Sequence, residues 1–280
     1  MDEPLARWRA ELDAWAIPEE ILAAAPESPW SFPVGLFRVR AERAAATRTP
    51  SNLEALRWLP PGGTVLDVGA GGGAASLPLA GQAGRLVAVD ESAGMAEAFL
   101  VAAAKAGVDA EAVTGRWPEV AGRVGPAEVV VCHHVFYNVA DLAPFAAALT
   151  GHARRRVVVE LTDRHPLVAM APLWRRFHGL ERPAGPTADD AAAALRSLGL
   201  DLERQDWESE PRTGFDRLED LVAFTRRRLC LPADRDPEVE AALLEAGARQ
   251  VDGCWAAGGS RRLATLSWPG RAGPGGPGEP

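Results

Sequence analysis

A single carboxylate stands in front of a cluster of glycines in the stretch Thr64–Ala80, which reads TVLDVGAGGGAASLPLA. The carboxylate is Asp67, and four glycines follow it within five positions: Gly69, Gly71, Gly72 and Gly73. A glycine-rich turn before a helix lets a ligand approach the backbone and meet free N–H groups. A carboxylate beside such a turn would repel a pyrophosphate. It suits a ligand that carries positive charge.

A second group of residues that could take part in catalysis follows the apolar run EVVVC: His133, His134 and Tyr137. An imidazole can act as a general base where a substrate must lose a proton. Neighbouring side chains on an extended segment diverge and no third ligand is evident, so the two histidines predict no metal site. The alternative is that His133 contacts a ligand through its backbone and that Tyr137 only packs.

The elements that must position these residues alternate between strand and helix. Near-continuous apolar strands with helices between them are typical of a parallel sheet covered on both faces. We expect strands at residues 64–68, 85–90, 110–113, 128–132, 156–161, about 200–207 and 261–268, and helices at about 73–82, 92–105 and 141–150. The fold class is therefore α/β, a doubly wound Rossmann-like sheet of seven strands.

Residues 1–60 precede this pattern and predict an N-terminal helical cap. Leu5, Trp8, Leu12 and Trp15 recur at helical spacing, and Trp8, Trp15 and Trp58 are expected in the core. Ser51 and Glu54 form a capping-box pattern that opens a later helix.

The remaining boundaries follow from composition and spacing. Trp30 and Phe32 lie in a proline-flanked loop and are candidates for lining a pocket. The sheet domain is expected over residues 61–268, with a helical insertion at about 208–255. Thr187 and Asp190 predict the capped start of a helix before that insertion. The tail 269–280 has no apolar residue worth burying and is predicted to be disordered.

Composition narrows the partners. The 280 residues are 47 % hydrophobic and 24 % charged, with a net charge of −8. The sequence therefore lacks the excess of basic residues that is typical of nucleic-acid-binding proteins. Three separated cysteines form no disulfide framework, and the charged N-terminus does not resemble a signal segment. No apolar run is long enough to span a membrane. These observations predict a cytoplasmic protein without a membrane or nucleic-acid partner. They leave its oligomeric state open.

Three segments together resemble the class I S-adenosylmethionine-dependent methyltransferases. The first is DVGAGGG at residues 67–73, which is similar to the DxGxGxG motif of that family. The second is VAVDESAGM at residues 87–95, and the third is VVVCHHVFYNV at residues 129–139. The resemblance covers about residues 60–165 and implies S-adenosylmethionine as the cofactor.

The resemblance also implies roles for individual residues. Asp67 would lie near the methionyl end, Asp90 would hold the ribose hydroxyls and Met95 would pack on the adenine. One departure is Arg116, which replaces a carboxylate that accepts from the adenine amino group in the family and cannot itself accept a hydrogen bond. The full expected cofactor set is Asp67, Gly69, Ala70, Gly71, Gly73, Asp90, Glu91, Met95, Arg116, Trp117 and His133.

The function that this resemblance implies is methyl transfer to a small-molecule acceptor by in-line displacement. The acceptor would be enclosed by residues 28–40 and 166–230, with Trp30, Phe32, Phe37 and Tyr137 as candidate contacts. The catalytic candidates are His133, His134 and Tyr137. Two alternatives stay open: an S-adenosylmethionine-binding regulatory protein without chemistry, and an NAD-dependent oxidoreductase, since Gly69-x-Gly71-x-x-Ala74 also satisfies a dinucleotide fingerprint.

Overall fold

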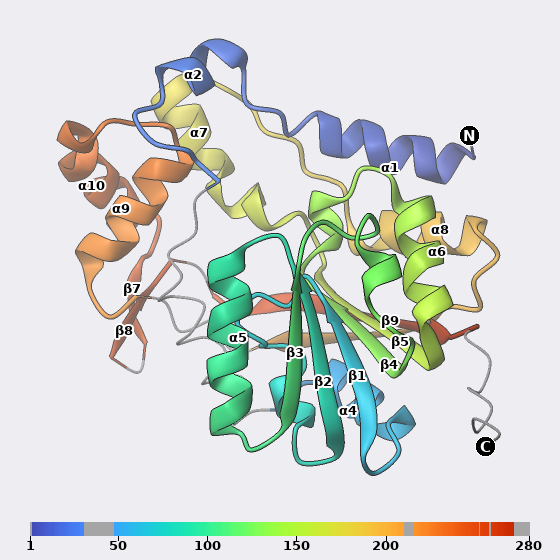
Figure 1. The fold of residues 1–280 in the computed structure, drawn as a ribbon. Coiled ribbons are helices and arrows are strands. Elements are labelled where there is room, and N and C mark those ends of the chain that lie inside the picture. Colours follow the sequence, from blue (N-terminus) through green and yellow to red (C-terminus); the bar gives the residue numbers. More distant parts are fainter. Residues whose placement is uncertain (1, 31–47, 210–214, 252, 258, 272–280) are drawn as a thin grey trace, which may run out of the picture.

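A seven-stranded sheet forms the centre of the molecule (Figure 1). The computed structural model describes residues 2–30, 48–209, 215–251, 253–257 and 259–271. The sheet has the order β3-β2-β1-β4-β5-β9-β6, and β9 runs antiparallel to both of its neighbours. The strands are β1 (Gly63–Val68), β2 (Ala83–Asp90), β3 (Asp109–Thr114), β4 (Ala127–His133), β5 (Ala153–Thr162), β6 (Glu203–Ser209) and β9 (Arg261–Pro269). The predicted doubly wound Rossmann-like sheet of seven strands is confirmed.

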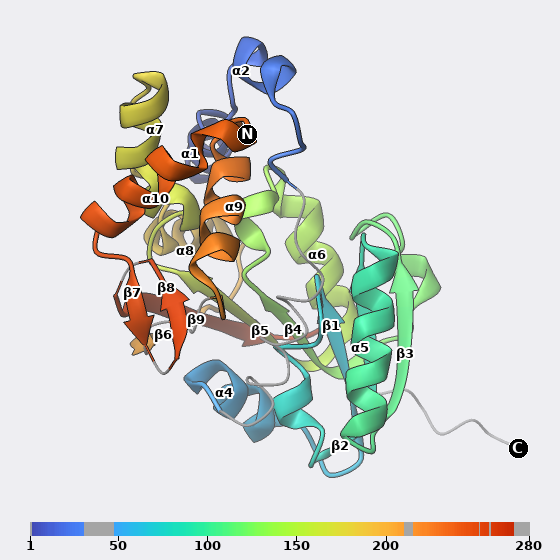
Figure 2. The ribbon, with the colours of Figure 1, turned by 90° about the vertical axis from the view of Figure 1, so that its left-hand side faces the viewer.

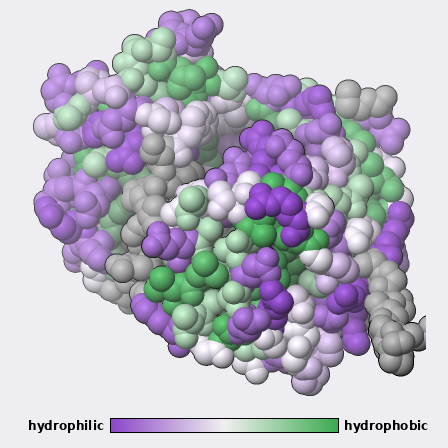
Figure 3. Space-filling view, in the orientation of Figure 1, coloured by the Kyte–Doolittle hydropathy of each residue, from purple (hydrophilic) through white to green (hydrophobic). Residues whose placement is uncertain are grey.

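Helices cover both faces of this sheet (Figures 1 and 2). One face packs against α4 (Pro50–Trp58) and α5 (Ala93–Lys105). The other packs against α6 (Leu142–His152) and α8 (Ala188–Ser197), with α1 (Glu3–Asp13) lying against α8. The exposed side of α5 carries Leu100 and Val101, and Figure 3 shows hydrophobic surface over this helix.

A separate lobe with its own apolar core lies beyond the carboxyl ends of the parallel strands (Figure 1). Its core includes Trp174, Leu221 and Leu243, with Ile17 and Ile21 packed against them. The elements of the lobe are α2 (Glu19–Ala24), α7 (Ala171–His178), α9 (Leu218–Arg228), α10 (Asp236–Glu245), β7 (Arg249–Val251) and β8 (Cys254–Ala256). The helices expected to form one N-terminal cap pack in three different places. The helices α1 and α4 lie on opposite faces of the sheet, and α2 is part of the lobe.

The tryptophans of the N-terminal segment are anchored by both burial and hydrogen bonds. Trp8 is fully buried and donates from Nε1 to the carbonyl of Val139 at 2.8 Å. Trp15 donates to the carbonyl of Gly185 at 2.5 Å and stacks on His165, with ring centroids 4.2 Å apart. The predicted core positions of Trp8 and Trp15 are confirmed.

Two local predictions are wrong. The helix expected at 73–82 is a turn that ends in a short 3₁₀ segment, Leu77–Leu79, because Pro78 cannot donate to a continuing helix. The capping box of α4 is formed by Thr49 and Asn52 rather than by Ser51 and Glu54. The Ser51 hydroxyl instead lies 2.6 Å from that of Thr265 on β9.

Two other local predictions can be followed in the same way. The capping box of Thr187 and Asp190 opens α8 as predicted. Most of the predicted disordered tail lies outside the described residues, but Gly270 and Arg271 donate backbone hydrogen bonds to Arg155 and Thr150.

Candidate cofactor site

The turn after β1 requires glycine for its shape. Gly69, Gly71 and Gly73 have φ angles of +71°, +52° and +91°, a region that other residues rarely adopt. A Cβ on Gly69 would lie 2.3 Å from Cγ2 of Val135, so the backbone of the turn is pressed against the segment after β4. Any side chain at Gly69 would separate these two segments.

Asp67 lies at the end of β1 with its side chain fully buried. Its Oδ2 accepts a hydrogen bond from the hydroxyl of Ser76 at 2.6 Å, and its Oδ1 has no partner among the described residues. Burial, together with the nearby charge of Asp90, raises the pKa of Asp67 to about 7 even though the Ser76 bond opposes that change. An unpartnered buried carboxylate oxygen fits a ligand group that carries positive charge.

Asp90 ends β2 and organises the same turn. Its Oδ2 accepts from the backbone N–H of Gly71 at 2.8 Å, and its Oδ1 accepts from that of Ser92 at 2.9 Å. Ser92 in turn caps α5, since its hydroxyl accepts from the N–H of Met95. Each carboxylate oxygen keeps acceptor capacity for one more donor, which is what a ligand diol offers.

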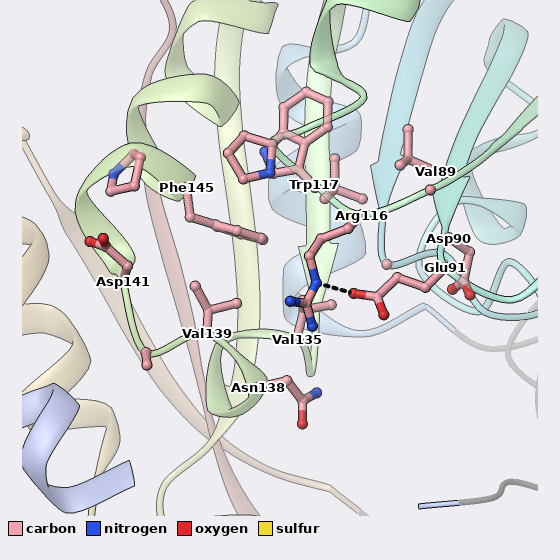
Figure 4. Close-up of a pocket in the computed structure, with 16 residues that line it drawn as sticks. Val89, Asp90, Glu91, Arg116, Trp117, Val135, Asn138, Val139, Asp141 and Phe145 are labelled. Atoms are coloured by element: carbon pink, nitrogen blue, oxygen red, sulfur yellow. Dashed lines mark hydrogen bonds and ion pairs between the residues drawn. The ribbon is translucent and has the colours of Figure 1, made fainter. Parts of the chain in front are cut away.

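A pocket opens beside this turn, between two walls that face each other (Figure 4). It has an empty volume of about 950 Å³, including the space open to solvent. One wall comes from the ends of β1, β2 and β3 and includes Gly69, Asp90, Glu91, Arg116 and Trp117, all predicted from the sequence. The opposite wall follows β4 and was not predicted: Val135, Asn138, Val139, Ala140, Asp141, Pro144 and Phe145.

Arg116 and Glu91 form an ion pair on the first wall, with Nε and Oε1 2.9 Å apart (Figure 4). Both side chains are 64 % exposed, so this pair lies at the opening of the pocket rather than inside it. Trp117 is buried and meets the ring of His152 edge-on, with centroids 4.9 Å apart. The indole therefore has a fixed orientation where it borders the pocket.

Other predicted cofactor residues are not part of the lining. Ala70 and Met95 are buried, and Ala70 packs in the core on the α5 face of the sheet. Gly73 is packed close to Phe99 and Leu77. The roles expected for these residues in cofactor binding stay predictions.

The predicted catalytic residues fall into two environments. His133 and His134 both lie beside the buried carboxylate of Glu160, at 3.9 Å from His133 Nδ1 and 3.0 Å from His134 Nε2. Tyr137 is buried, stacks against Trp8 and donates from its hydroxyl to the carbonyl of Thr162 at 2.5 Å. Burial raises the pKa of Tyr137, so the packing alternative describes its surroundings better.

The predicted acceptor contacts are only partly described. Trp30 is half exposed, and the guanidinium of Arg228 lies over its ring at 5.9 Å. Phe32 and Phe37 lie outside the described residues. Within the described ranges, no three His, Cys, Asp or Glu side chains converge as metal ligands, and no helix is long and apolar enough to cross a membrane.

Comparisons with known proteins agree with this geometry. Residues 65–155 match the family described as "Methyltransferase domain". No curated protein matches the chain. Among solved structures, a cyclopropane-fatty-acyl-phospholipid synthase-like protein from Lactobacillus casei is 15 % identical, with a TM-score of 0.53 over 94 % of this chain and 99 % of that one. The YcgJ protein from Bacillus subtilis is 15 % identical, with a TM-score of 0.51 over 83 % and 100 %.

At these identities the structural likeness establishes the fold. The matched family, the fold and the site define the class: residues 65–155 belong to a methyltransferase domain of the class I, S-adenosylmethionine-dependent type. The chain therefore carries a methyltransferase domain, with S-adenosylmethionine as the expected cofactor.

Proposed function

We propose that this methyltransferase acts on a small-molecule acceptor held between the carboxyl edge of the sheet and the lobe. The topology supports this position. The lobe segments leave the sheet after β5 and β6 and return at the start of β9, and all three points are at the carboxyl edge. Ligands of open α/β sheets bind at that edge. The net charge of −8 does not favour a nucleic-acid acceptor.

The observation that carries the proposal is the unpartnered, buried Oδ1 of Asp67, two residues before Gly69, which lines the pocket together with Asp90. In the proposed arrangement Asp67 faces the cationic methionyl end, the turn Gly69–Gly73 borders the ribose and Asp90 accepts from its hydroxyls. The adenine lies between the walls formed by Trp117 and Phe145. When bound, S-adenosylmethionine supplies a methyl group on a positively charged sulfur, open to in-line displacement by a nucleophile.

The chain contributes mainly by positioning. A rigid glycine turn and a buried aromatic wall hold the reacting partners close, which can supply much of the acceleration of such a transfer. The lobe excludes water from the acceptor side. No residue of the turn needs to gain or lose a proton for this role.

Two measurements test the proposal. Calorimetry should show binding of S-adenosylhomocysteine that weakens roughly 10- to 100-fold in Asp90→Ala, the range expected when hydrogen bonds to a charged group are lost. Asp109→Ala, an exposed carboxylate on the neighbouring strand β3, is the matched control and should bind normally. Incubation of the wild type with S-adenosylmethionine and a host metabolite extract should yield a methylated small molecule, identified by mass. Methylation of nucleic acid or protein alone would contradict the proposal.

A further inference from the structure

Arg261 is the first residue of β9 and stands where the chain returns from the lobe to the sheet. Because β9 runs antiparallel to β5, the start of β9 lies at the carboxyl end of β5, where Leu263 pairs with Thr162. The backbone carbonyl of Arg261 accepts a hydrogen bond from the hydroxyl of Ser209 on β6 at 3.4 Å. Arg261 is therefore at the edge of the sheet where the acceptor is proposed to bind.

The side chain of Arg261 lies on the same face of the sheet as that of Asp67. Side chains alternate along a strand, so Arg261 shares a face with Thr265. The hydroxyl of Thr265 lies 2.6 Å from that of Ser51 on α4, which identifies this face as the α4 face. Val65 packs in the core on the same face, and by the same alternation Asp67 belongs to it. Arg261 and the carboxylate proposed to face the methionyl end are thus on one side of the sheet.

The guanidinium of Arg261 is half-buried without a partner. Among the residues that the structure describes, none forms a hydrogen bond or an ion pair with this side chain, and burial alone lowers its pKa. A charged group that leaves water costs free energy unless an opposite charge or hydrogen bonds compensate for its lost hydration. The fold therefore keeps a cation at this edge without supplying an anion for it.

The other arginines in the described ranges that are buried or half-buried all have a partner. Arg182 donates to the carbonyl of Ala16 at 3.2 Å, and the guanidinium of Arg228 lies over the ring of Phe224 at 5.3 Å. Carboxylates pair with the remaining ones: Arg9, Arg154, Arg156, Arg204, Arg226, Arg227 and Arg235. Arg261 departs from this pattern, which indicates that its partner is a ligand.

We infer that Arg261 binds an anionic group of the methyl acceptor, a carboxylate or a phosphate. This inference rests on the proposed function, since it concerns the acceptor of that reaction. A guanidinium presents its N–H donors in a planar fork that matches the oxygens of either group, and such charge-assisted hydrogen bonds are strong. Strands β1 and β9 are three strand spacings apart, about 14 Å. A small molecule can hold its anionic group on Arg261 while its reacting atom extends toward the methyl group on the Asp67 side.

Anion binding at Arg261 can be tested before the acceptor is known. In the complex with S-adenosylhomocysteine, the Nε–H resonance of Arg261 is followed by NMR during titration with sodium acetate and with sodium phosphate, and sodium chloride is the control for ionic strength. Acetate or phosphate should shift this resonance to saturation, and the anion that binds more tightly identifies the acceptor as a carboxylate or a phosphate. The resonance of Arg262, which is exposed on the opposite face, should not move. If neither anion shifts the Arg261 resonance more than chloride does, the inference is overturned.

The kinetic test uses the acceptor identified in the metabolite extract. Arg261→Gln should raise the KM for this acceptor about 10- to 100-fold, the range expected when hydrogen bonds between charged groups are lost. Arg261→Lys should raise it less, because lysine keeps the charge but not the planar fork. Both variants should keep S-adenosylhomocysteine affinity within about 2-fold, which shows that the cofactor site is folded. Arg262→Gln is the matched control and should keep the wild-type KM. An unchanged KM in Arg261→Gln contradicts the inference.

Stability separates a binding role of Arg261 from a structural one. Arg261→Met removes an uncompensated charge and keeps an apolar side chain, so the midpoint of urea unfolding should stay unchanged or rise. Arg156→Met removes a buried guanidinium that has carboxylate partners, and it should lower the midpoint in the same assay. A lowered midpoint in Arg261→Met would show that its guanidinium has a partner within the folded chain, and the inference would fail.

The outcomes separate the two proposals. If the wild type forms no methylated small molecule, the proposed function fails and this inference about its acceptor fails with it. If the wild type methylates a small molecule that carries neither a carboxylate nor a phosphate, only this inference fails.

Discussion

Replacing Asp67 by asparagine should remove a large pH dependence from the stability of the protein. Burial raises the pKa of this carboxyl from its ordinary value of 3.8 to about 7. Each pKa unit corresponds to about 1.36 kcal/mol, so ionising the buried group costs the folded state about 4 kcal/mol. Between these two pH values the folded protein keeps a proton that the unfolded chain has lost.

The sign of the effect follows from that difference. The stabilising contribution of protonated Asp67 is complete below pH 3.8 and is lost as the pH rises through about 7. Urea unfolding at steps from pH 4 to pH 8 should therefore show the wild type losing about 4 kcal/mol relative to Asp67→Asn. Asp109→Asn, whose side chain is 70 % exposed, is the control and should follow the wild type.

One outcome of the urea-unfolding experiment would refute this reasoning about Asp67. If wild type and Asp67→Asn lose stability in parallel over this range, Asp67 is not the buried, largely protonated carboxyl that the structure indicates. A companion measurement is calorimetry of S-adenosylmethionine binding at pH 6 in buffers of different ionisation enthalpy. Binding of the cation should release a proton from Asp67 in the wild type and none from this position in the variant.

Three further substitutions test the packing around the site. Gly69→Ala should abolish measurable S-adenosylhomocysteine binding by calorimetry, since its Cβ would lie 2.3 Å from Val135; normal binding would refute the close approach. Trp8→Phe should lower the unfolding free energy by about 1–3 kcal/mol in urea and weaken cofactor binding, because it leaves the carbonyl of Val139, a pocket residue, unpaired. Arg156→Met should cost about 3–5 kcal/mol by the same assay, since it leaves Glu54 without its buried partner; a smaller loss would mean that this pair contributes little.

The sequence was most informative where chemistry and local structure coincide. Two apolar strands are easily recognised in the sequence, and Asp67 and Asp90 lie at their carboxyl ends. Since the carboxyl ends of parallel strands meet at one edge of the sheet, the sequence predicts that these two residues and the glycines lie at that edge. The residues that line the first wall of the pocket, including Glu91, Arg116 and Trp117, were expected from the resemblance to the methyltransferase family.

The second wall could not be found, because tertiary packing brings it there. Asn138, Asp141 and Phe145 belong to a 3₁₀ turn and the start of α6, and no local pattern marks them as facing β2. Glu160 was missed for a related reason, since the sequence places it inside the strand predicted at residues 156–161. The one available signal was a carboxylate inside a run of residues that are all expected to be buried.

The errors in local structure also have physical causes. Ser51 and Glu54 have the spacing of a capping box, but Thr49 stands two residues earlier with Pro50 at the first helical position, which favours the earlier start. The lobe was divided in the prediction between an N-terminal cap and an insertion. Its apolar core joins Ile17 and Ile21 to α7, α9 and α10, a long-range contact that periodicity does not contain.

The two tryptophans of the N-terminal segment are buried by residues far along the chain, which has a consequence for synthesis on the ribosome. Trp8 finds its hydrogen-bond partner 131 residues later in the chain, and Trp15 finds its own 170 residues later. At translation rates of about 5–20 residues per second, these indoles wait roughly 7 to 34 seconds for the residues that accept their hydrogen bonds. During that interval the two indoles lack the partners that they have in the folded protein, and the speed of translation up to Val139 and Gly185 sets how long each of them waits.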